Sequence, residues 1–329
     1  MGIAVSYHDK VEKLQQFDRC AGGPFDRSEW FALLATDAER PVFVLASDAR
    51  TTIALPLMET AEGYDSLVNW FTFAWRALSS ADDLPLELLA AAARDLRQRT
   101  HRVILNPVPD EDGNATQVAA AFREAGWAVF LEPCDENHIL RPRGRDFATY
   151  WAGRPGRLRT TLQRKGHKVE AEIFNRFDEV AWGEYRSVYE SSWKPEEERA
   201  DLLEAFARAE GAAGRLRLGI ARAGGRPVAA QFWTVENETA FIHKLAHLED
   251  AKPLSAGTTL SAALFAHVID TDKVEIVDFG TGSDAYKRDW MEEVRLRYRI
   301  SCLDWRQPRA WPQLARTVGR HIARKLTSR

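Results

Sequence analysis

Apolar residues recur with two different spacings along the first 140 residues. Spacings of three and four predict helices over residues 28–35, 86–99 and 116–125. Short runs rich in apolar and β-branched residues predict strands over residues 42–46, 52–57, 102–105 and 127–131. Helices and strands that follow one another in this way are typical of a mixed α/β fold.

The strongest local pattern is a predicted antiparallel meander in the second half of the chain. Residues 215–223 are strand-like and residues 227–235 and 239–245 alternate, and these segments are separated by the turns Gly224-Gly225 and Glu236-Asn237. Before the meander we expect helices over residues 154–166, 179–192 and 196–209 and a strand over 169–174. After it we expect a helix from about residue 256 to 269, strands over 274–279 and 296–303, and a glycine-rich loop over 280–284.

Length and charge indicate two domains with a basic junction. The chain has 329 residues, of which 45% are hydrophobic and 28% charged, with a mean hydropathy of -0.37, which excludes a wholly disordered chain. The formal net charge is only -3, so no global field attracts nucleic acid. Basic residues dominate between residues 141 and 168. We therefore expect an N-terminal domain over 1–145, a C-terminal domain over 146–305 and a basic tail over 306–329.

Cysteine usage and hydropathy bear on location. Cys20, Cys134 and Cys302 are far apart in the sequence, which excludes a disulfide framework, a zinc ribbon and a CxxC pair. Neither a signal peptide nor an apolar run of about 18 residues is visible. We expect a cytoplasmic protein with no bound metal.

The start of the helix that follows the meander is a candidate phosphate site. Glycine permits close approach of the backbone, hydroxyl groups add donors, and the helix dipole favours an anion. The residues concerned are Ser255, Gly257, Thr258 and Thr259. The alternative is a capped helix without a ligand.

The order of these elements and one motif resemble the acyl-transfer core of the GNAT superfamily. The pattern D-F-G-x-G-x-x-x-Y-K-x-x-W is similar to that of the FemAB-like branch, which includes acetyltransferase-like proteins of cellulose and exopolysaccharide synthesis. Its residues here are Asp278, Phe279, Gly280, Gly282, Tyr286, Lys287 and Trp290. The resemblance covers residues 147–303 well, although the usual proline before the helix glycine is Ala256.

The resemblance implies a fold and an activity. The fold expected is α/β (α+β), with tandem GNAT-like domains that each hold a mixed, largely antiparallel sheet flanked by helices. The N-terminal copy is expected to lack a donor site and to serve the acceptor side. The activity implied is direct transfer of an acyl group from acyl-CoA, as a co-substrate without a tightly bound cofactor, to a small-molecule or glycan-linked amine, in cell-envelope or exopolysaccharide metabolism.

Three candidates for catalysis lie in the second half. Asp278 is a candidate base or ammonium ligand, with a loop carboxylate bonded to local amides as the alternative. Tyr286 is a candidate for protonating the leaving group or orienting the acyl carbonyl, with packing on the sheet as the alternative. His243 has the pKa range of a base near neutrality. The adjoining Lys287 is a candidate donor ligand, unless it is a solvated surface lysine.

The acceptor side is expected to involve Lys244, Trp193 and Lys194. Since neighbouring residues of a strand point to opposite faces, we expect only one of His243 and Lys244 to face the site. His243 and His247 are four residues apart, so the same rule predicts that they share a face. With no third ligand nearby, a metal site is not expected there.

Two basic segments remain open to several interpretations. The segment from Arg154 to Lys168 is a solvated helix, a contact for donor phosphates, or a dock for an acyl carrier protein or tRNA. In the tail, Leu314 and Val318 begin an apolar stripe that recurs every fourth residue among basic residues, which fits packing on the protein or contact with the inner face of a membrane. Transfer from acyl-ACP or aminoacyl-tRNA, and a catalytically silent accessory protein, are the alternatives to an acyl-CoA enzyme. The sequence gives no indication of oligomeric state.

Overall fold

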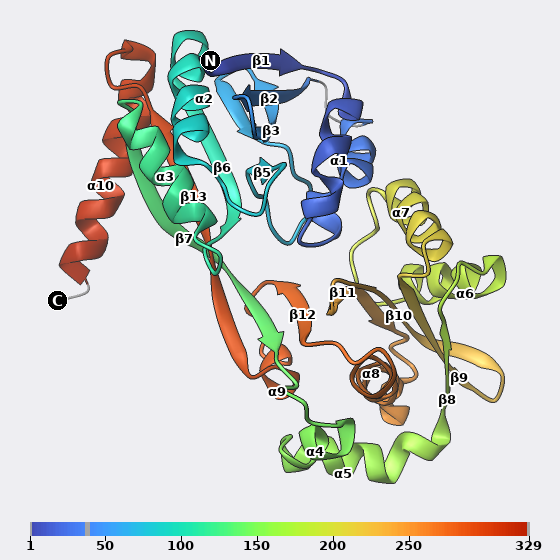
Figure 1. Cartoon of the computed structure of the whole chain (residues 1–329). Helices are drawn as coiled ribbons and strands as arrows, with labels where there is room; N and C mark the ends of the chain where they lie inside the picture. Colours follow the sequence, from blue (N-terminus) through green and yellow to red (C-terminus); the bar gives the residue numbers. More distant parts are fainter. Residues whose placement is uncertain (1, 37–39, 328–329) are drawn as a thin grey trace. The chain divides into compact units, whose positions relative to one another are not determined.

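The computed structural model describes residues 2–36 and 40–327, and the side chains of the last helix as far as Arg320 (Figure 1). The chain divides into two compact units, Met1–Glu136 with Arg295–Arg329, and Asn137–Val294. These limits differ from the expected boundaries after residues 145 and 305. The reason is that the last strand, β13 (Glu293–Leu303), pairs with strand β6 (Arg102–Pro109) of the first unit.

The first unit is built on a mixed, largely antiparallel sheet in the order β1-β2-β3-β4-β6-β13-β7, with β5 paired to β3. Its other strands are β1 (Ala4–His8), β2 (Pro41–Ser47), β3 (Thr52–Thr60), β4 (Gly63–Ser66), β5 (Leu78–Ser79) and the first part of β7 (Ala128–Leu140). Its α-helices are α1 (Ser28–Ala35), α2 (Leu86–Arg99), α3 (Asn114–Glu124) and α10 (Trp311–Thr327). The expected helices and strands of this half are confirmed, and most ends differ by a few residues. The exception is the strand expected over 127–131, which continues as β7 to Leu140.

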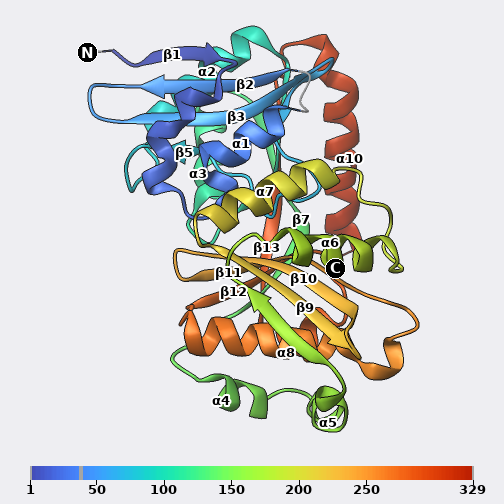
Figure 2. The ribbon, with the colours of Figure 1, turned by 90° about the vertical axis from the view of Figure 1, so that its right-hand side faces the viewer.

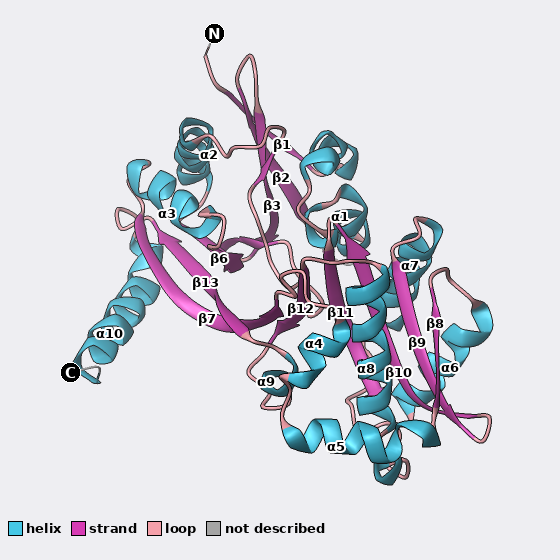
Figure 3. Ribbon diagram, turned by 60° about the horizontal axis from the view of Figure 1, so that its bottom comes forward, coloured by secondary structure: helices cyan, strands magenta, loops and turns pink. Residues whose placement is uncertain are grey.

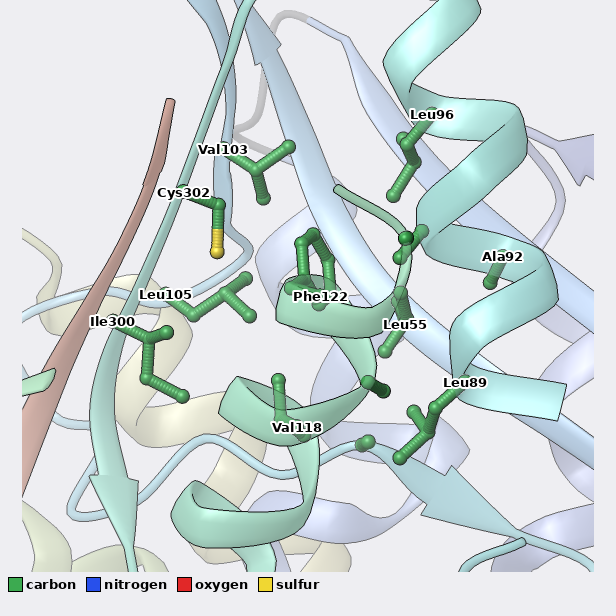
Figure 4. Close-up of a cluster of buried hydrophobic side chains, with 14 of the residues drawn as sticks. Leu55, Leu89, Ala92, Leu96, Val103, Leu105, Val118, Phe122, Ile300 and Cys302 are labelled. Atoms are coloured by element: carbon green, nitrogen blue, oxygen red, sulfur yellow. The ribbon is translucent and has the colours of Figure 1, made fainter. Parts of the chain in front are cut away.

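The core of the first unit lies between this sheet and helices α2 and α3 (Figure 4). Helix α2 presents alanines and leucines to the sheet, and Ala90, Ala92 and Ala93 are fully buried. Because alanine is short, the helix backbone packs closely on the strands. Ile300 and Cys302 of β13 complete the same cluster. Strand β13 is far from α2 and α3 in the sequence, but its residues are therefore part of the core of the first unit.

The second unit holds the expected meander. Its strand order is β7-β12-β11-β10-β9-β8, in which only the β11–β12 pair is parallel. The strands are β8 (Glu170–Phe174), β9 (Leu216–Ala223), β10 (Arg226–Glu236), β11 (Thr239–His247), β12 (Ile276–Thr281) and the end of β7. The α-helices are α4 (Phe147–Ala152), α5 (Gly156–Lys165), α6 (Glu179–Glu190), α7 (Ala200–Ala212), α8 (Ala256–Ala266) and α9 (Lys287–Trp290).

Helices cover both faces of the meander (Figure 2). On one face Trp233 packs edge-on against Phe265 of α8, with ring centroids 5.2 Å apart. On the other face its neighbour Phe232 contacts Trp182 of α6 and Phe206 of α7. Successive side chains of β10 thus point to opposite faces of the sheet and pack against helices on both sides, as expected for a strand.

Helix α10 has one buried edge. Thr317 is fully buried, whereas the neighbouring Val318 is 37% exposed. Leu314 is half-buried. Ile322 and Leu326 of the predicted stripe, and Arg329 at the end of the basic run, fall outside the described side chains. None of the described helices combines the length and the apolar character that crossing a bilayer requires.

Candidate functional site

The start of α8 is an uncapped helix N-terminus beside a lysine. Ser255 precedes the helix in a left-handed conformation, with φ of 55°, and its side chain does not cap the helix. Instead its Oγ accepts a hydrogen bond of 3.1 Å from Lys165 Nζ. Lys165 is the last residue of α5, and α5 lies beside α8 (Figure 3). The first N–H groups of an α-helix have no partner within the helix. Gly257 and Thr258 therefore lie at the positive end of a helix dipole with a cation next to it.

A buried glutamine attaches the first turn of α8 to the sheet. Gln231 of β10 donates from Nε2 to Gly257 O at 3.2 Å and to Ser261 Oγ at 2.7 Å. Its Oε1 accepts from Trp233 Nε1 at 3.0 Å, which fixes the amide orientation. Thr259 is buried and its N–H donates to Ser255 O at 3.1 Å. Of the predicted hydroxyls, those of Ser255 and Thr259 thus make internal contacts.

The glycine-rich loop after β12 is organised by Asp278 and two glycines. Asp278 Oδ1 accepts hydrogen bonds of 2.7 Å from Asn137 Nδ2 and from Gly280 N–H. Gly280 and Gly282 have φ of 67° and 100°, a region that favours glycine. These contacts are those of the structural alternative for Asp278, and they explain physically why a D-x-G-x-G spacing suits this turn.

Tyr286 and Lys287 fold back on the same loop. The Tyr286 ring packs edge-on against Phe279 at 5.6 Å and remains 40% exposed. Burial, with the Asp284 charge as a smaller contribution, raises the pKa of Tyr286 to about 12, so its phenol stays protonated near neutral pH. Lys287 is buried, and its ammonium donates to Thr281 O and lies over the Phe279 ring. Lys287 is thus not the solvated surface lysine of the alternative interpretation.

A β-bulge corrects the expected orientation of His243 and Lys244. The β10–β11 register shifts between Phe232 and Trp233, so that Phe232 pairs with Lys244 and Trp233 with Ile242. His243 is the extra residue, and both it and Lys244 point to the face covered by α6 and α7. The expectation that they point to opposite faces is wrong for this reason.

His243 lies among aromatic rings on that face. Its Nε2 is 2.8 Å from Thr234 Oγ1, and its ring contacts Phe206 and Phe232 with centroids 5.2 and 4.9 Å away. His247 lies beyond the bulge, next to Gly257 at the start of α8 on the other face. The expected shared face of the two histidines is therefore also wrong.

Lys244 is held in a buried ion pair that the sequence does not reveal. Its Nζ is 2.7 Å from Glu197 Oε2, and it lies 5.5 Å above the Tyr189 ring. Burial lowers the pKa of Lys244 although Glu197 opposes the shift. Glu197 stands in the run Glu196-Glu197-Glu198, which reads as a solvated charge cluster, so no local signal separates it from its neighbours.

Trp193 and Lys194 connect the acceptor-side candidates with the start of α8. The Trp193 ring is 48% exposed and packs at a tilt of 46° against the His247 ring, with centroids 4.2 Å apart. A Cβ added at Gly257 would lie 3.5 Å from His247 Nδ1. Burial and then the charge of Lys244 lower the pKa of Lys194, while Asp284 opposes this. Trp193, His247 and Gly257 therefore form a continuous surface within the second unit.

The basic segment from Arg154 to Lys168 divides into two parts. Arg154 pairs with Glu292, and Arg157 binds both oxygens of Asp289 at 2.6 Å. These arginines join the α4–α5 segment to the segment after α9. The later residues include Lys165 at Ser255 and the exposed Lys168. No residue of α5 is buried.

One cavity among the described residues lies in the first unit. It has a volume of about 340 Å³ and is lined by Asp26, Arg76, Asp112 and Asn114 among others. Burial raises the pKa of Asp26, and Arg76 opposes the shift. None of the candidate residues of the second unit lines it.

Among the described residues no group of His, Cys, Asp and Glu side chains has the arrangement of a metal site.

A comparison with protein families finds a similarity for part of the second unit. Residues 151–288 match the family model of the acetyltransferase (GNAT) domain. No curated protein matches the chain by sequence. The predicted resemblance to the GNAT superfamily is thereby confirmed for the part of the chain that carries the motif.

Solved structures share the fold over most of the chain. FemX matches with a TM-score of 0.64 and 8% identity, over 92% of this chain and 98% of FemX. L-PGS from Bacillus licheniformis matches with 0.61 and 17%, over 91% and 94%. The C-terminal domain of a putative lysylphosphatidylglycerol synthetase from Agrobacterium fabrum matches with 0.60 and 14%, over 94% and 96%. The expected fold class is confirmed, and it is residues 151–288 that match the acetyltransferase (GNAT) domain model.

Proposed function

We propose that this protein is an N-acyltransferase that moves an acyl group from an acyl-CoA thioester to an amine. The observation that carries the proposal is the ammonium of Lys165 next to the uncapped start of α8. A cation at the positive end of a helix dipole is unfavourable by about 0.3–1 kcal/mol. A phosphate between the two reverses the sign of both interactions. The pyrophosphate of a CoA donor carries this negative charge, and Gly257, which has no side chain, leaves the backbone N–H groups open to it.

The proposed reaction needs no covalent enzyme intermediate. The neutral amine attacks the thioester carbonyl carbon, a C–N bond forms, the C–S bond breaks, and CoA leaves as a thiol after taking up one proton. The proton lost by the attacking amine passes to a base or to solvent. We assign to Asp278 the role of holding or deprotonating the amine. We assign to Tyr286, whose raised pKa keeps it protonated, a hydrogen bond to the acyl carbonyl or the leaving sulfur.

His243 is the less suitable base of the candidates. Its Nε2 already has Thr234 Oγ1 at 2.8 Å, and aromatic rings surround its imidazole. We assign two roles to Lys287. It orders the loop over residues 280–284, and its positive charge attracts the phosphates of the donor. Its ammonium is committed to Thr281 O, so direct contact with a phosphate requires another rotamer.

The acceptor is proposed to be an amine on a polar, sugar-like or acidic molecule. The exposed ring of Trp193 offers a flat face for a sugar, and Lys194 and Lys244 supply positive charge beside it. A glycan-linked amine of cell-envelope or exopolysaccharide metabolism satisfies these requirements. A neutral hydrophobic amine does not, because it would offer no polar or acidic group to Lys194, while Lys244 is already paired with Glu197.

A second candidate donor is an acyl group carried on a macromolecule, either acyl carrier protein or aminoacyl-tRNA. The favouring observation is that α5 and the residues after it expose His167, Arg164 and Lys168 near Lys165, and that the segment 147–168 has no acidic residue. The C-terminal domain of a putative lysylphosphatidylglycerol synthetase shares the fold, and the lysyl group in that name makes an aminoacyl group a reasonable cargo. A free CoA needs only the start of α8, whereas a polyanion needs the whole exposed stretch.

The test is ligand-induced thermal stabilisation with a matched pair of lysine variants. At 100 times its Kd, a ligand that binds only the native state adds about 2.7 kcal/mol to the free energy of unfolding. We expect CoA, acetyl-CoA or a long-chain acyl-CoA to raise Tm. Lys165→Gln is expected to weaken this effect, whereas Lys168→Gln, three residues away and exposed, leaves it unchanged.

The lysine pair also separates the alternatives. If no CoA compound raises Tm, filter binding with acyl carrier protein and aminoacyl-tRNA follows, and both variants are expected to weaken binding of a polyanion. If neither macromolecule binds, the catalytically silent accessory protein is the remaining interpretation, and the enzymatic proposal is rejected.

A further inference from the structure

Lys194 differs from the other lysines of the candidate site in the contacts of its ammonium. The ammonium groups of Lys165, Lys244 and Lys287 each have an oxygen partner. In the described part of the chain no hydrogen bond or ion pair holds Lys194 Nζ, which lies 5.7 Å from the centroid of the Trp193 ring. When Lys194 loses its proton, the nitrogen lone pair is therefore available for reaction.

The main chain holds Lys194 beside the first turn of α8. Ser192 forms an isolated antiparallel bridge with Leu248, and Lys194 N–H donates to Ser192 Oγ at 3.2 Å. Leu248 follows His247, whose ring packs against Trp193 and lies next to the first turn of α8. The short segment that carries Lys194 is thus attached to the end of β11.

Lys194 lies near both of the contacts assigned to the donor. Its charge lowers the pKa of His247, which lies at the phosphate end of the donor site. The charge of Asp284 raises the pKa of Lys194 and also that of Tyr286, which is assigned to the acyl carbonyl or the leaving sulfur. Because salt screens charges that are more than about 10 Å apart, these mutual effects place Lys194 close to the path of the donor.

The surroundings of Lys194 favour its neutral form. Its side chain is half-buried. Burial, followed by the charge of Lys244, lowers the pKa of Lys194, while Asp284 and Glu197 oppose the shift. A lower pKa increases the neutral fraction near pH 7, and only the neutral amine is a nucleophile.

We propose that Lys194 is a modification site, which is acylated by the acyl-CoA that this protein binds. The neutral Nζ attacks the thioester carbonyl carbon, a C–N bond forms and the C–S bond breaks. The proton lost by the nitrogen is taken up by the leaving CoA thiolate. The product is an uncharged amide, so the modification removes the positive charge beside Trp193. The reaction needs a bound acyl-CoA, so this inference rests on the proposed function.

The test is mass spectrometry of the full chain after incubation with acetyl-CoA, followed by peptide mapping. Lys10 is the internal reference, because it is exposed and belongs to the first unit. A group beside a bound donor experiences an effective concentration on the order of mM. At about 0.1 mM acetyl-CoA and pH 7.5 we therefore expect Lys194 to gain an acetyl group about tenfold faster than Lys10.

Three variants connect the modification with donor binding. Lys194→Arg keeps the charge but removes the nucleophile, and is expected to lose the modification while CoA still raises Tm. Lys165→Gln is expected to slow acetylation of Lys194 but not of Lys10, whereas Lys168→Gln leaves both rates unchanged. Excess CoA without an acyl group is expected to act like Lys165→Gln, because it occupies the donor site.

The pH dependence of the two rates is a second measurement. The acetylation rate of an amine stops rising once the amine is fully neutral. Since burial and Lys244 lower the pKa of Lys194 against the charges of Asp284 and Glu197, its rate is expected to level off at a lower pH than the rate of Lys10.

The possible outcomes separate this inference from the proposed function. If CoA raises Tm but Lys194 reacts no faster than Lys10, or if both rates level off at the same pH, the modification is rejected and the proposed function stands. If Lys194 reacts fast but neither excess CoA nor Lys165→Gln slows it, the reaction does not use the donor site and the inference is overturned. If no CoA compound raises Tm and Lys194 is not acetylated, the proposed acyl-CoA donor and the inference fail together.

Discussion

The ion pair between Lys244 and Glu197 permits a quantitative prediction. Their side chains are 8% and 13% exposed and 2.7 Å apart. Glu197→Gln removes the counter-charge and leaves a buried ammonium, a change that typically costs 3–5 kcal/mol. Lys244 limits this loss, because it can lose its proton. Keeping a lysine of ordinary pKa neutral at pH 7 requires about 1.36 × (10.4 − 7), or about 4.6 kcal/mol. We expect a loss of about 3 kcal/mol at pH 7.

The pH dependence follows from the same limit. Burial lowers the pKa of Lys244, so the unfolded state binds more protons and stability rises with pH between the folded and unfolded pKa values. In Glu197→Gln the free energy of unfolding rises more steeply with pH, because the Glu197 charge no longer opposes the lowering of the Lys244 pKa. The difference between the variant and the unchanged protein is therefore expected to shrink to about 1 kcal/mol at pH 10.

Urea unfolding at pH 7, 8.5 and 10 measures these differences. Glu198→Gln is the matched control, since Glu198 is exposed and adjacent in sequence. The double variant Glu197→Leu/Lys244→Met is expected to recover most of the lost stability, because replacing both charges by apolar groups is often close to neutral. The reasoning is refuted if Glu197→Gln lies within 0.5 kcal/mol of Glu198→Gln at pH 7, where RT is about 0.6 kcal/mol, or if its loss is the same at pH 7 and 10.

Three further predictions concern the same unit. Burial lowers the pKa of His247, so its contribution to stability is complete above about pH 6.5 and is lost as the pH falls; His247→Gln is expected to lose less stability between pH 7.5 and 5.5 in urea unfolding, and an equal loss would contradict this. Gly257→Ala places a Cβ at an ordinary 3.5 Å from His247 and is expected to raise the free energy of unfolding by up to about 1 kcal/mol while it reduces the CoA-induced rise in Tm; a destabilised variant with full CoA response would refute it. Asp278→Asn retains an oxygen acceptor for Asn137 and is expected to leave Tm nearly unchanged but lower kcat about 10²–10⁴-fold; unchanged kcat would reduce Asp278 to a structural role.

Much of the secondary structure was predictable because it depends on local patterns. The helices at residues 28–35 and 86–99 and the meander strands follow from spacing alone. Helix α7 begins at Ala200 rather than near residue 196, since Glu197 is used in a tertiary ion pair instead of a first helical turn. Helix α4 was missed because its six residues are too few to display a period.

The candidate site was only partly predictable. The glycine and hydroxyl residues before α8 and the glycines after Asp278 have recognisable local chemistry, and the structure places each in a turn or helix start. The bulge at His243 has no signal in the sequence, because it arises from the pairing of two strands. Glu197, Gln231 and Lys165 were not singled out for their individual roles, since an acid, an amide and a lysine acquire those roles only from the partners that the fold supplies.

The sequence by itself determined the α/β class, the meander with its helix start, the GNAT-like motif and the amphipathic basic tail. These features depend on residues within about a dozen positions of one another, so their physical causes are local. Only the tertiary structure decided that β13 pairs with β6, that His243 and Lys244 share a face, and that Thr317 of α10 is buried while Val318 is partly exposed. Each of these depends on contacts between segments far apart in the chain. Their free energy comes from burial and pairing that no local pattern records.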